Sequence, residues 1–420
     1  MNETDLHQVL ERATDAIDSP ALAAGALDVA LRRRVRVRGS VGVGAVALVV
    51  AAVVVGLQVA GSERTQPPLV TPPRTTETAT PDAPLIDPDV VAPAWDPATV
   101  PSLPLDPHLA LPQVLDPPAN APALENAPLG SAVAAMDTGD AVGFVSTDGS
   151  WRTVDHPEPA LEPAYVRDTV AISAGGDVLV FAGRTRLWWL DVREGEWRDV
   201  PYPQEMDLQA EWDMRLVLRT SATVEISGYA MVERRSRLRT WAVELSTGTA
   251  ELVPYLLDNT GFRGETTVRL DVVEGRRVLF QWTGTTLHRS LFVDAFHSLL
   301  YPVVGETSVA AAREVSSFHE PREVTEWDGL IAFDLVGGRT RAYLPVRDEN
   351  AWYSRGGLMP VAWVSDDVAV IRVIPKDSGG YEAGTAYLAT WNVETGALAR
   401  VSSYEVTAGL VLAPDILLRP

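Results

Sequence analysis

The chain of 420 residues contains no cysteine, which excludes disulfide bonds, thiolate metal sites, cysteine nucleophiles and a lipid-modified cysteine. Lysine is almost missing as well, because Lys376 is the only one and arginine supplies the other basic residues. Together with the many alanines, this usage indicates a GC-rich bacterial genome.

The motifs of common catalytic and nucleotide-binding sites are also missing. The sequence has no HExxH, no GxSxG and no GxxxxGK[ST]. None of its six histidines is followed by another four residues later, and a metal site of His288, His297 and His319 requires that the fold gather them. His156 and His297 stand near hairpin ends, where exposed loops are expected. We therefore predict no catalytic, cofactor-binding or metal-binding residues.

Charge is missing between Arg38 and Glu63, where the sequence is apolar. Roughly 20 apolar residues span a bilayer as a helix, so we predict one transmembrane helix over residues 39–61. Arginines crowd its N-terminal flank and resist translocation, which predicts a cytoplasmic N-terminus and an extracytoplasmic C-terminal part. These topology residues are Arg32, Arg33, Arg34, Arg36 and Arg38. A cleaved signal peptide ending near residues 59–61 is the alternative.

Residues 1–38 are predicted to be a cytoplasmic tail with one short amphipathic helix. Its apolar residues recur at helical spacing from Leu6 to Ile17, and Pro20 marks its end. Six acids and six arginines cancel in this tail, so the net charge of −21 lies beyond the membrane. An acidic surface repels phosphates, which argues against nucleic acid as a ligand of the large domain.

Proline is concentrated in residues 62–128, which hold 17 of the 31 prolines. Residues 62–89 add threonine and acid without apolar periodicity, which predicts a disordered stalk. In residues 90–129 apolar side chains from Trp95 to Leu124 punctuate the prolines. A flexible linker does not need them, so we expect this segment to pack on the folded domain without regular structure.

Residues 130–420 have the pattern of an all-β domain built from repeats. Each unit ends with a hairpin that has an acid and a glycine near its turn, where φ is expected to be positive. We identify hairpins at 143–157, 187–201, 240–254, 289–302, 329–345 and 388–403. The fourth lacks the turn glycine, and the sixth lacks the closing proline.

Units of roughly 45 residues with four strands are typical of propeller blades. Apolar runs such as Val178–Phe181, Arg277–Phe280 and Val368–Ile371 require burial on both faces. The fold class is therefore all-β, a six- or seven-bladed β-propeller. A seventh blade would come from residues 90–124 or from the C-terminal end, and the apolar run of residues 409–418 is a candidate closing strand.

Recurring acids and tryptophans have structural explanations in this pattern. Acids recur once per blade, which favours hydrogen bonds at turns or strand ends over catalysis; they are Asp148, Asp191, Asp294 and Asp334. Asp366 and Asp367 are expected in a turn. Neighbouring residues of a strand face opposite ways, so Trp188 and Trp189 are expected in different core layers.

The chain resembles propellers of the WD-repeat-like or Tol-associated kind, and a family of actinobacterial single-pass membrane proteins with an extracytoplasmic propeller. Residues that carry the resemblance are Arg32–Arg38, the span, Leu111–Pro112, Leu115–Pro118 and Asp148–Arg152. The GH…WD signature is missing, since strands end in Leu190–Asp191, Phe333–Asp334 or Trp391–Asn392. The resemblance implies a fold and a topology, and no activity.

The favoured function is a membrane-anchored, extracytoplasmic propeller that binds an envelope protein or a wall component. Its partners are then the lipid bilayer through residues 39–61 and that envelope component, with no nucleic acid and no cofactor. A transmembrane regulator similar to anti-sigma proteins is one alternative. A propeller hydrolase or lyase with a site at the central channel is another. The sequence does not identify the ligand, the oligomeric state or the choice between six and seven blades.

Overall fold

A computed structural model describes residues 90–139, 141–158, 170–206, 215–232, 235–257, 259–273, 276–294, 298–314, 329–346, 357–375, 384–407 and 409–418. The chain divides into Met1–Thr76 and Glu77–Pro420, and every described residue belongs to the second unit. The predicted tail, span and stalk, with the five topology arginines, lie outside the described residues. No helix in the described ranges has the length and hydrophobicity of a membrane span.

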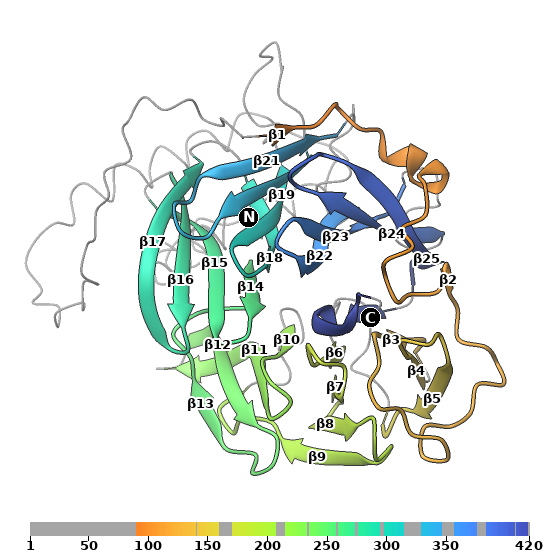
Figure 1. The fold of residues 1–420 in the computed structure, drawn as a ribbon. Coiled ribbons are helices and arrows are strands. Elements are labelled where there is room, and N and C mark those ends of the chain that lie inside the picture. The colour runs from red at the N-terminus through yellow and green to blue at the C-terminus, as the bar shows by residue number, and fades with distance from the viewer. Residues whose placement is uncertain are drawn as a thin grey trace, which may run out of the picture. The chain divides into compact units, whose positions relative to one another are not determined.

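Six sheets follow one another around a ring, and each contains four antiparallel strands (Figure 1). Blade 2 contains β6 (Val170–Ile172), β7 (Val178–Ala182), β8 (Arg186–Asp191) and β9 (Trp197–Pro201). Blade 3 contains β10 (Arg215–Leu218), β11 (Thr223–Val232), β12 (Arg235–Glu244) and β13 (Ala250–Leu252). Blade 4 contains β14 (Thr260–Arg263), β15 (Thr266–Val273), β16 (Arg276–Thr283) and β17 (Thr286–Asp294). The predicted propeller is therefore confirmed, with six blades.

Two blades carry a fifth strand from an N-terminal segment. Blade 5 contains β18 (Ser298–Val304), β19 (Ser308–Glu314), β20 (Gly329–Asp334) and β21 (Thr340–Pro345), and β1 (Val90–Val91) pairs in parallel with β21. Blade 6 contains β22 (Leu358–Ser365), β23 (Val368–Val373), β24 (Thr385–Asn392) and β25 (Leu398–Glu405), and β2 (Val114–Leu115) pairs in parallel with β25.

The C-terminal strand closes the ring at blade 1. There β26 (Gly409–Leu412) pairs with β3 (Ala134–Asp137), followed outward by β4 (Ala141–Val145) and β5 (Trp151–Asp155). The closing strand predicted in residues 409–418 is confirmed. A short 3-10 helix, η5 (Pro414–Ile416), follows β26 and lies near the centre of the ring in Figure 1.

Residues 90–129 run along the outer edges of blades 5, 6 and 1, and we call them the N-terminal wrap (Figure 1). Besides β1 and β2 the wrap contains the 3-10 helix η1 (Pro97–Ser102), and Ala123 bridges to Thr153 of β5. The wrap buries apolar side chains in three core clusters; they are Ala92, Val100, Leu109, Ala110, Leu111, Leu115, Leu124 and Leu129. Burial of this kind holds an otherwise irregular segment on the domain.

The core consists of clusters between neighbouring blades. Five clusters of buried hydrophobic residues fill the boundaries 1–2, 2–3, 4–5, 5–6 and 6–1. Trp188 packs on the cluster between blades 1 and 2, and Trp189 on that between blades 2 and 3, as the strand alternation predicted. At the boundary between blades 3 and 4, a buried polar network lies beside aromatic side chains: Arg219 pairs with Glu225, and Tyr255 donates to the same carboxylate.

One predicted hairpin was wrong. Residues 289–302 do not form a hairpin but span the last strand of blade 4 and the first strand of blade 5. The outer hairpin of blade 4 joins β16 to β17 through Gly284, whose φ is 55°. No acid precedes that glycine, so the acid–glycine pattern pointed to Asp294, which instead ends β17.

Candidate binding site

The turns that join first to second and third to fourth strands gather on one face of the ring, because strands within a blade alternate in direction. We call it the turn face. In four blades a backbone N–H of the outer turn donates to a carbonyl of the inner turn. These bonds are Val192 to Asp177, Leu245 to Ala222, Leu335 to Thr307 and Val393 to Asp367, at 2.8–2.9 Å. The two turns of a blade therefore form one rigid edge.

Three of the four recurring acids, Asp148, Asp191 and Asp334, accept hydrogen bonds in these turns, as predicted. The side chain of the fourth, Asp294, is not described. The side chain of Asp191 accepts a hydrogen bond from the N–H of Arg193 at 2.8 Å, and Asp334 accepts one from Val336 at 2.8 Å. Asp148 accepts from the N–H of Ser150, and its hydrogen bond with Ser146 is the main reason why its pKa falls to about 2. The turn glycines have the positive φ that was expected: 81° at Gly149, 75° at Gly195, 70° at Gly248, 68° at Gly338 and 73° at Gly396.

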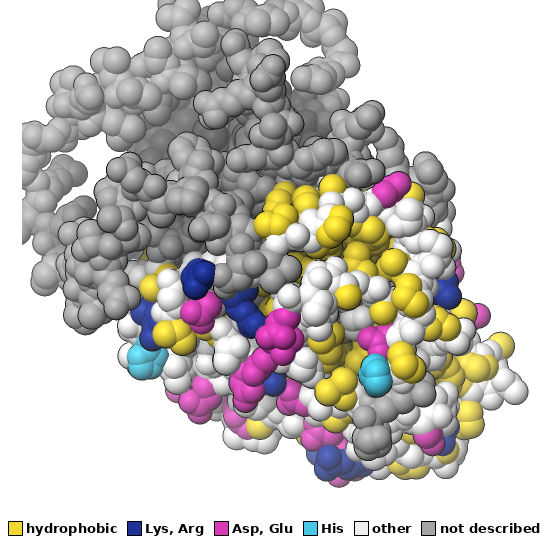
Figure 2. All heavy atoms as spheres, turned by 45° about the horizontal axis from the view of Figure 1, so that its top comes forward, with side chains coloured by type: hydrophobic (Ala, Val, Ile, Leu, Met, Phe, Trp, Pro, Cys, Tyr) yellow, Lys and Arg dark blue, Asp and Glu magenta, His cyan; other side chains and the backbone are white. Residues whose placement is uncertain are grey.

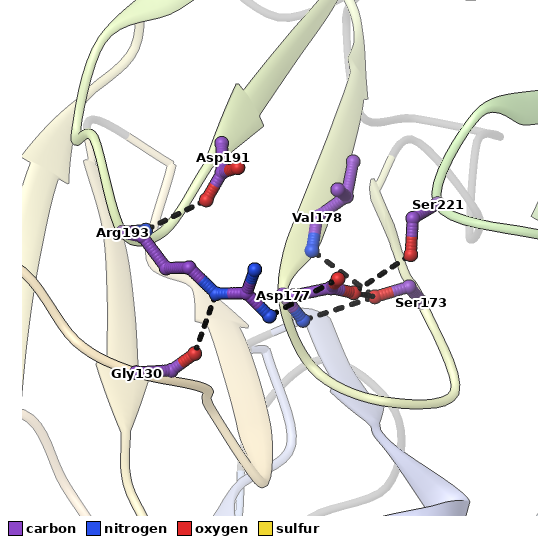
Figure 3. A network of polar contacts seen from close by, with 7 residues as sticks. All are labelled: Gly130, Ser173, Asp177, Val178, Asp191, Arg193 and Ser221. Carbon is purple, nitrogen blue, oxygen red and sulfur yellow. Dashed lines mark hydrogen bonds and ion pairs between the residues drawn. The ribbon is translucent and has the colours of Figure 1, made fainter.

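Asp177, in the inner turn of blade 2, joins three blades (Figure 3). It accepts hydrogen bonds from Ser173 at 2.6 Å and from Ser221 of blade 3 at 2.8 Å, and it lies 3.5 Å from the guanidinium of Arg193. Arg193 also donates to the carbonyl of Gly130, which leads into blade 1, at 3.2 Å. Burial raises the pKa of Asp177, but the serine hydrogen bonds, a backbone bond and Arg193 outweigh it, so the pKa is lowered. The carboxylate is therefore a structural clamp.

Arginines link the later blade boundaries on the same face. Arg289 of blade 4 donates to the carbonyls of Leu335 and Val336 in blade 5. Arg341 of blade 5 donates to Ser308, to the carbonyl of Asp366 at 3.1 Å and to the carboxylate of Asp367 at 3.0 Å. These contacts hold neighbouring turns in fixed relative positions, and fixed loops on a rigid framework suit binding.

A cavity of about 450 Å³ opens where the turns of blades 5 and 6 meet. Its lining is charged except for one hydroxyl; the lining residues are Thr307, Asp334, Arg339, Arg341, Asp366 and Asp367. Asp334 is held by the N–H groups of its own turn, and Asp367 by Arg341. Val336, in the same turn as Asp334, is 67% exposed. The cavity thus offers both signs of charge beside an exposed apolar side chain.

The chemistry of this cavity fits a polypeptide better than a small apolar ligand. Small-molecule pockets are lined mostly by hydrophobic and aromatic groups, with few polar ones. Here arginine and aspartate side chains dominate, and they complement the mixed charges of a protein surface. Figure 2 shows acidic side chains, with basic ones among them, gathered on one part of the described surface.

The histidines do not assemble into a metal site in the part of the chain that the structure describes. No group of three or more His, Asp or Glu residues able to hold a metal occurs there, and His297 and His319 lie outside it. The expectation that His156 lies in an exposed loop was wrong. Its side chain is 4% exposed, its Nε2 lies 3.0 Å from Asp137, and its ring packs on Phe181 at 4.4 Å.

Comparisons with known proteins concern the fold alone. No protein-family model and no curated protein sequence matches the chain. The structure is similar to TolB from Acinetobacter baumannii, with 10% identity over 66% of this chain and 66% of that chain, and a TM-score of 0.40. It is similar to a putative TolB from Agrobacterium tumefaciens, with 12% identity over 65% of this chain and 90% of that chain, and a TM-score of 0.41. A third structure is the β-propeller domain of the Trilobed protease from Pyrococcus furiosus, with 11% identity, coverage of 65% and 82%, and a TM-score of 0.40.

Sequence reasoning missed the cavity. The sequence placed Asp366 and Asp367 in a turn, and the structure does the same. Nothing in the sequence indicated that Arg339 and Arg341 would line a site, because their meeting with blade 6 depends on how adjacent blades dock.

Proposed function

We propose that the chain is a single-pass membrane protein whose propeller stands outside the plasma membrane and binds an envelope protein or a wall component. The turn-face cavity between blades 5 and 6 is the binding site. The observation that carries the proposal is the charged cavity, whose position the clamps of Arg341 and Asp334 fix. A polypeptide of the envelope is the favoured class because the cavity presents both arginine and aspartate.

The membrane part of the proposal rests on the sequence. The apolar run of residues 39–61 is long enough to span a bilayer, and the five arginines before it favour a cytoplasmic N-terminus. The proline-rich stalk of residues 62–89 would hold the propeller away from the membrane. At about 3.1 Å per residue, an extended chain of this composition acts as a spacer.

A photo-crosslinking amino acid at Val336 of the full-length chain in its native cells tests the binding site. The expected result is one discrete adduct of the propeller, because the side chain is exposed beside the cavity. Leu252, which is 51% exposed on the outer strand of blade 3, is the matched control and is expected to give no such adduct.

A second substitution links the adduct to the cavity itself. Asp366 provides only its backbone carbonyl to Arg341 in the bonds described above, so Asp366→Asn changes the charge of the cavity and keeps that clamp. We expect Asp366→Asn to reduce the Val336 adduct at least fivefold, at unchanged protein level. Equal adducts at Val336 and Leu252, or an adduct indifferent to Asp366→Asn, would contradict the proposal.

A further inference from the structure

The outer edges of the blades are not equivalent. Among the described residues, the wrap pairs with the outer strands of blades 5, 6 and 1. Within the described ranges, the outer strands of blades 2, 3 and 4 pair on their inner side only. An edge strand exposes unpaired N–H and carbonyl groups, which readily accept another strand.

A β-bulge distinguishes three of the six outer strands. The pairing of β21 with β20 shifts at Arg341, and that of β25 with β24 shifts at Val401. The pairing of β17 with β16 shifts at His288 and again at Val293. The outer strands of blades 1, 2 and 3 pair without such a shift. A bulge bends and twists an edge strand and re-aims its outer groups.

Two of the bulged strands, β21 and β25, pair with a parallel strand of the wrap just beyond the bulge. Val90 and Val91 pair with Ala342 and Tyr343, directly after the bulge at Arg341. Val114 and Leu115 pair with Ser403 and Tyr404, two residues after the bulge at Val401. In each case a small residue is followed by a large one.

The third bulged strand, β17, repeats this arrangement, and no strand among the described residues pairs with its outer edge. After His288, residues Arg289, Ser290, Leu291 and Phe292 pair regularly with β16. Ser290 is exposed and Leu291 packs half-buried on the cluster between blades 4 and 5, so a small residue again precedes a large one. β17 lies on the outside of the ring in Figure 1.

We propose that the edge of β17 from Ser290 to Leu291 binds an extended strand of a partner protein, which adds in parallel to blade 4. Such β-augmentation takes its affinity from backbone hydrogen bonds and its specificity from alternate side chains. The strands that already occupy the equivalent edges define the chemistry of the partner. In each of these strands an exposed valine precedes a buried apolar residue, and a proline follows that residue within two positions. The residues are Val91, Ala92 and Pro93 in one strand, and Val114, Leu115 and Pro117 in the other.

The edge of β17 belongs to blade 4, whereas the residues that line the turn-face cavity belong to blades 5 and 6. Asp366→Asn changes the cavity and not β17, so the two proposals are tested separately.

Disulfide trapping tests the edge, because the chain has no cysteine of its own. The full-length Ser290→Cys protein is incubated with a peptide that has the sequence of residues 112–118. In this peptide cysteine replaces Val114, the residue that pairs with Ser403. Paired Cα atoms of adjacent strands are about 4.8 Å apart, within the range of a disulfide. After correction for the reaction of each thiol with glutathione, we expect at least tenfold more adduct than with a scrambled peptide.

Two matched variants define the control yields. Glu251→Cys lies exposed on β13, an outer strand without a bulge, and Ser403→Cys lies on an edge that β2 already covers. Both are expected to give the yield of the scrambled peptide. Equal adduct yields at Ser290→Cys and Glu251→Cys would overturn the proposal. Disulfide formation between two Ser290→Cys copies that is faster than the reaction with the peptide would also overturn it, because the occupant of the edge would then be a second copy of the chain. Amide exchange of residues 289–292 should slow at least tenfold in the adduct, and unchanged exchange would also overturn it.

Discussion

Removal of residues 409–420 is expected to abolish cooperative unfolding of the propeller. The deletion removes β26, which pairs with all four residues of β3, and it removes Ala413 and Leu417, which are fully buried. It also exposes an edge of β3, and such edges promote aggregation. Tryptophan fluorescence during urea unfolding measures the effect, and we expect an unfolded or aggregated chain in place of a sigmoidal transition.

A single substitution at Leu417 also tests whether the C-terminal segment stabilises the closed ring. Leu417 is 0% exposed, whereas its neighbour Leu418 is 46% exposed. Leu417→Ala is expected to lower the free energy of unfolding by about 2–5 kcal/mol, the usual range for a buried leucine. Leu418→Ala is the control and should change it by less than about 0.5 kcal/mol. Equal effects of the two substitutions would mean that the C-terminus does not close the ring as described.

Loss of one partner of the buried pair between blades 3 and 4 is expected to have the second large effect. Arg219 Nε lies 3.2 Å from Glu225 Oε1, and the two side chains are 8% and 4% exposed. Tyr255 donates to the same carboxylate at 2.7 Å, and Arg219 stacks on Phe262 at 4.7 Å. Glu225→Ala leaves a guanidinium with only backbone acceptors, so we expect a loss of about 3–5 kcal/mol in unfolding free energy.

A double-mutant cycle separates the interaction energy of Arg219 with Glu225 from the cost of leaving one of the two charges buried alone. The single variants of the cycle are Arg219→Met, which leaves a buried carboxylate, and Glu225→Leu, which leaves the guanidinium, and each should cost a similar amount. The double variant with both substitutions should recover most of the loss. Additive effects of the two single substitutions would show that the residues do not act as a pair.

The pH dependence of the same site has a defined sign. Burial raises the pKa of Glu225 above its usual 4.5, and the opposing effects of Arg219 and Tyr255 do not cancel it. A raised folded-state pKa favours the folded protein below 4.5, and this contribution is lost as pH rises through the raised value. Relative to Glu225→Gln, the natural chain should therefore gain stability as pH falls toward 4.5; the opposite slope would contradict a raised pKa.

The sequence predicted the propeller because local rules act within each blade. Acids and glycines at turns such as Asp191 and Gly195 depend on neighbouring residues, and five of the six outer hairpins followed them. The rule failed at blade 4, where Gly284 turns the chain without an acid. The closing strand was visible as an apolar run, but its place beside β3 requires the completed ring.

The candidate site was less predictable, since it lies between blades. Asp366 belongs to the first turn of blade 6 and Arg339 follows the outer turn of blade 5, and only the docking of these blades brings them to one cavity. His156 was misplaced for the same reason, because Phe181 of the next blade covers its ring. Sequence spacing describes contacts within a hairpin and not those across a boundary.

Labelling of Val336→Cys with a membrane-impermeant maleimide tests the central claim, that the propeller stands outside the cell membrane. The chain has no other cysteine, and residue 336 is exposed, so one thiol reports the side of the membrane. We predict full labelling on intact cells, equal to that after lysis. Labelling that appears only after lysis would place the propeller in the cytoplasm and contradict the account.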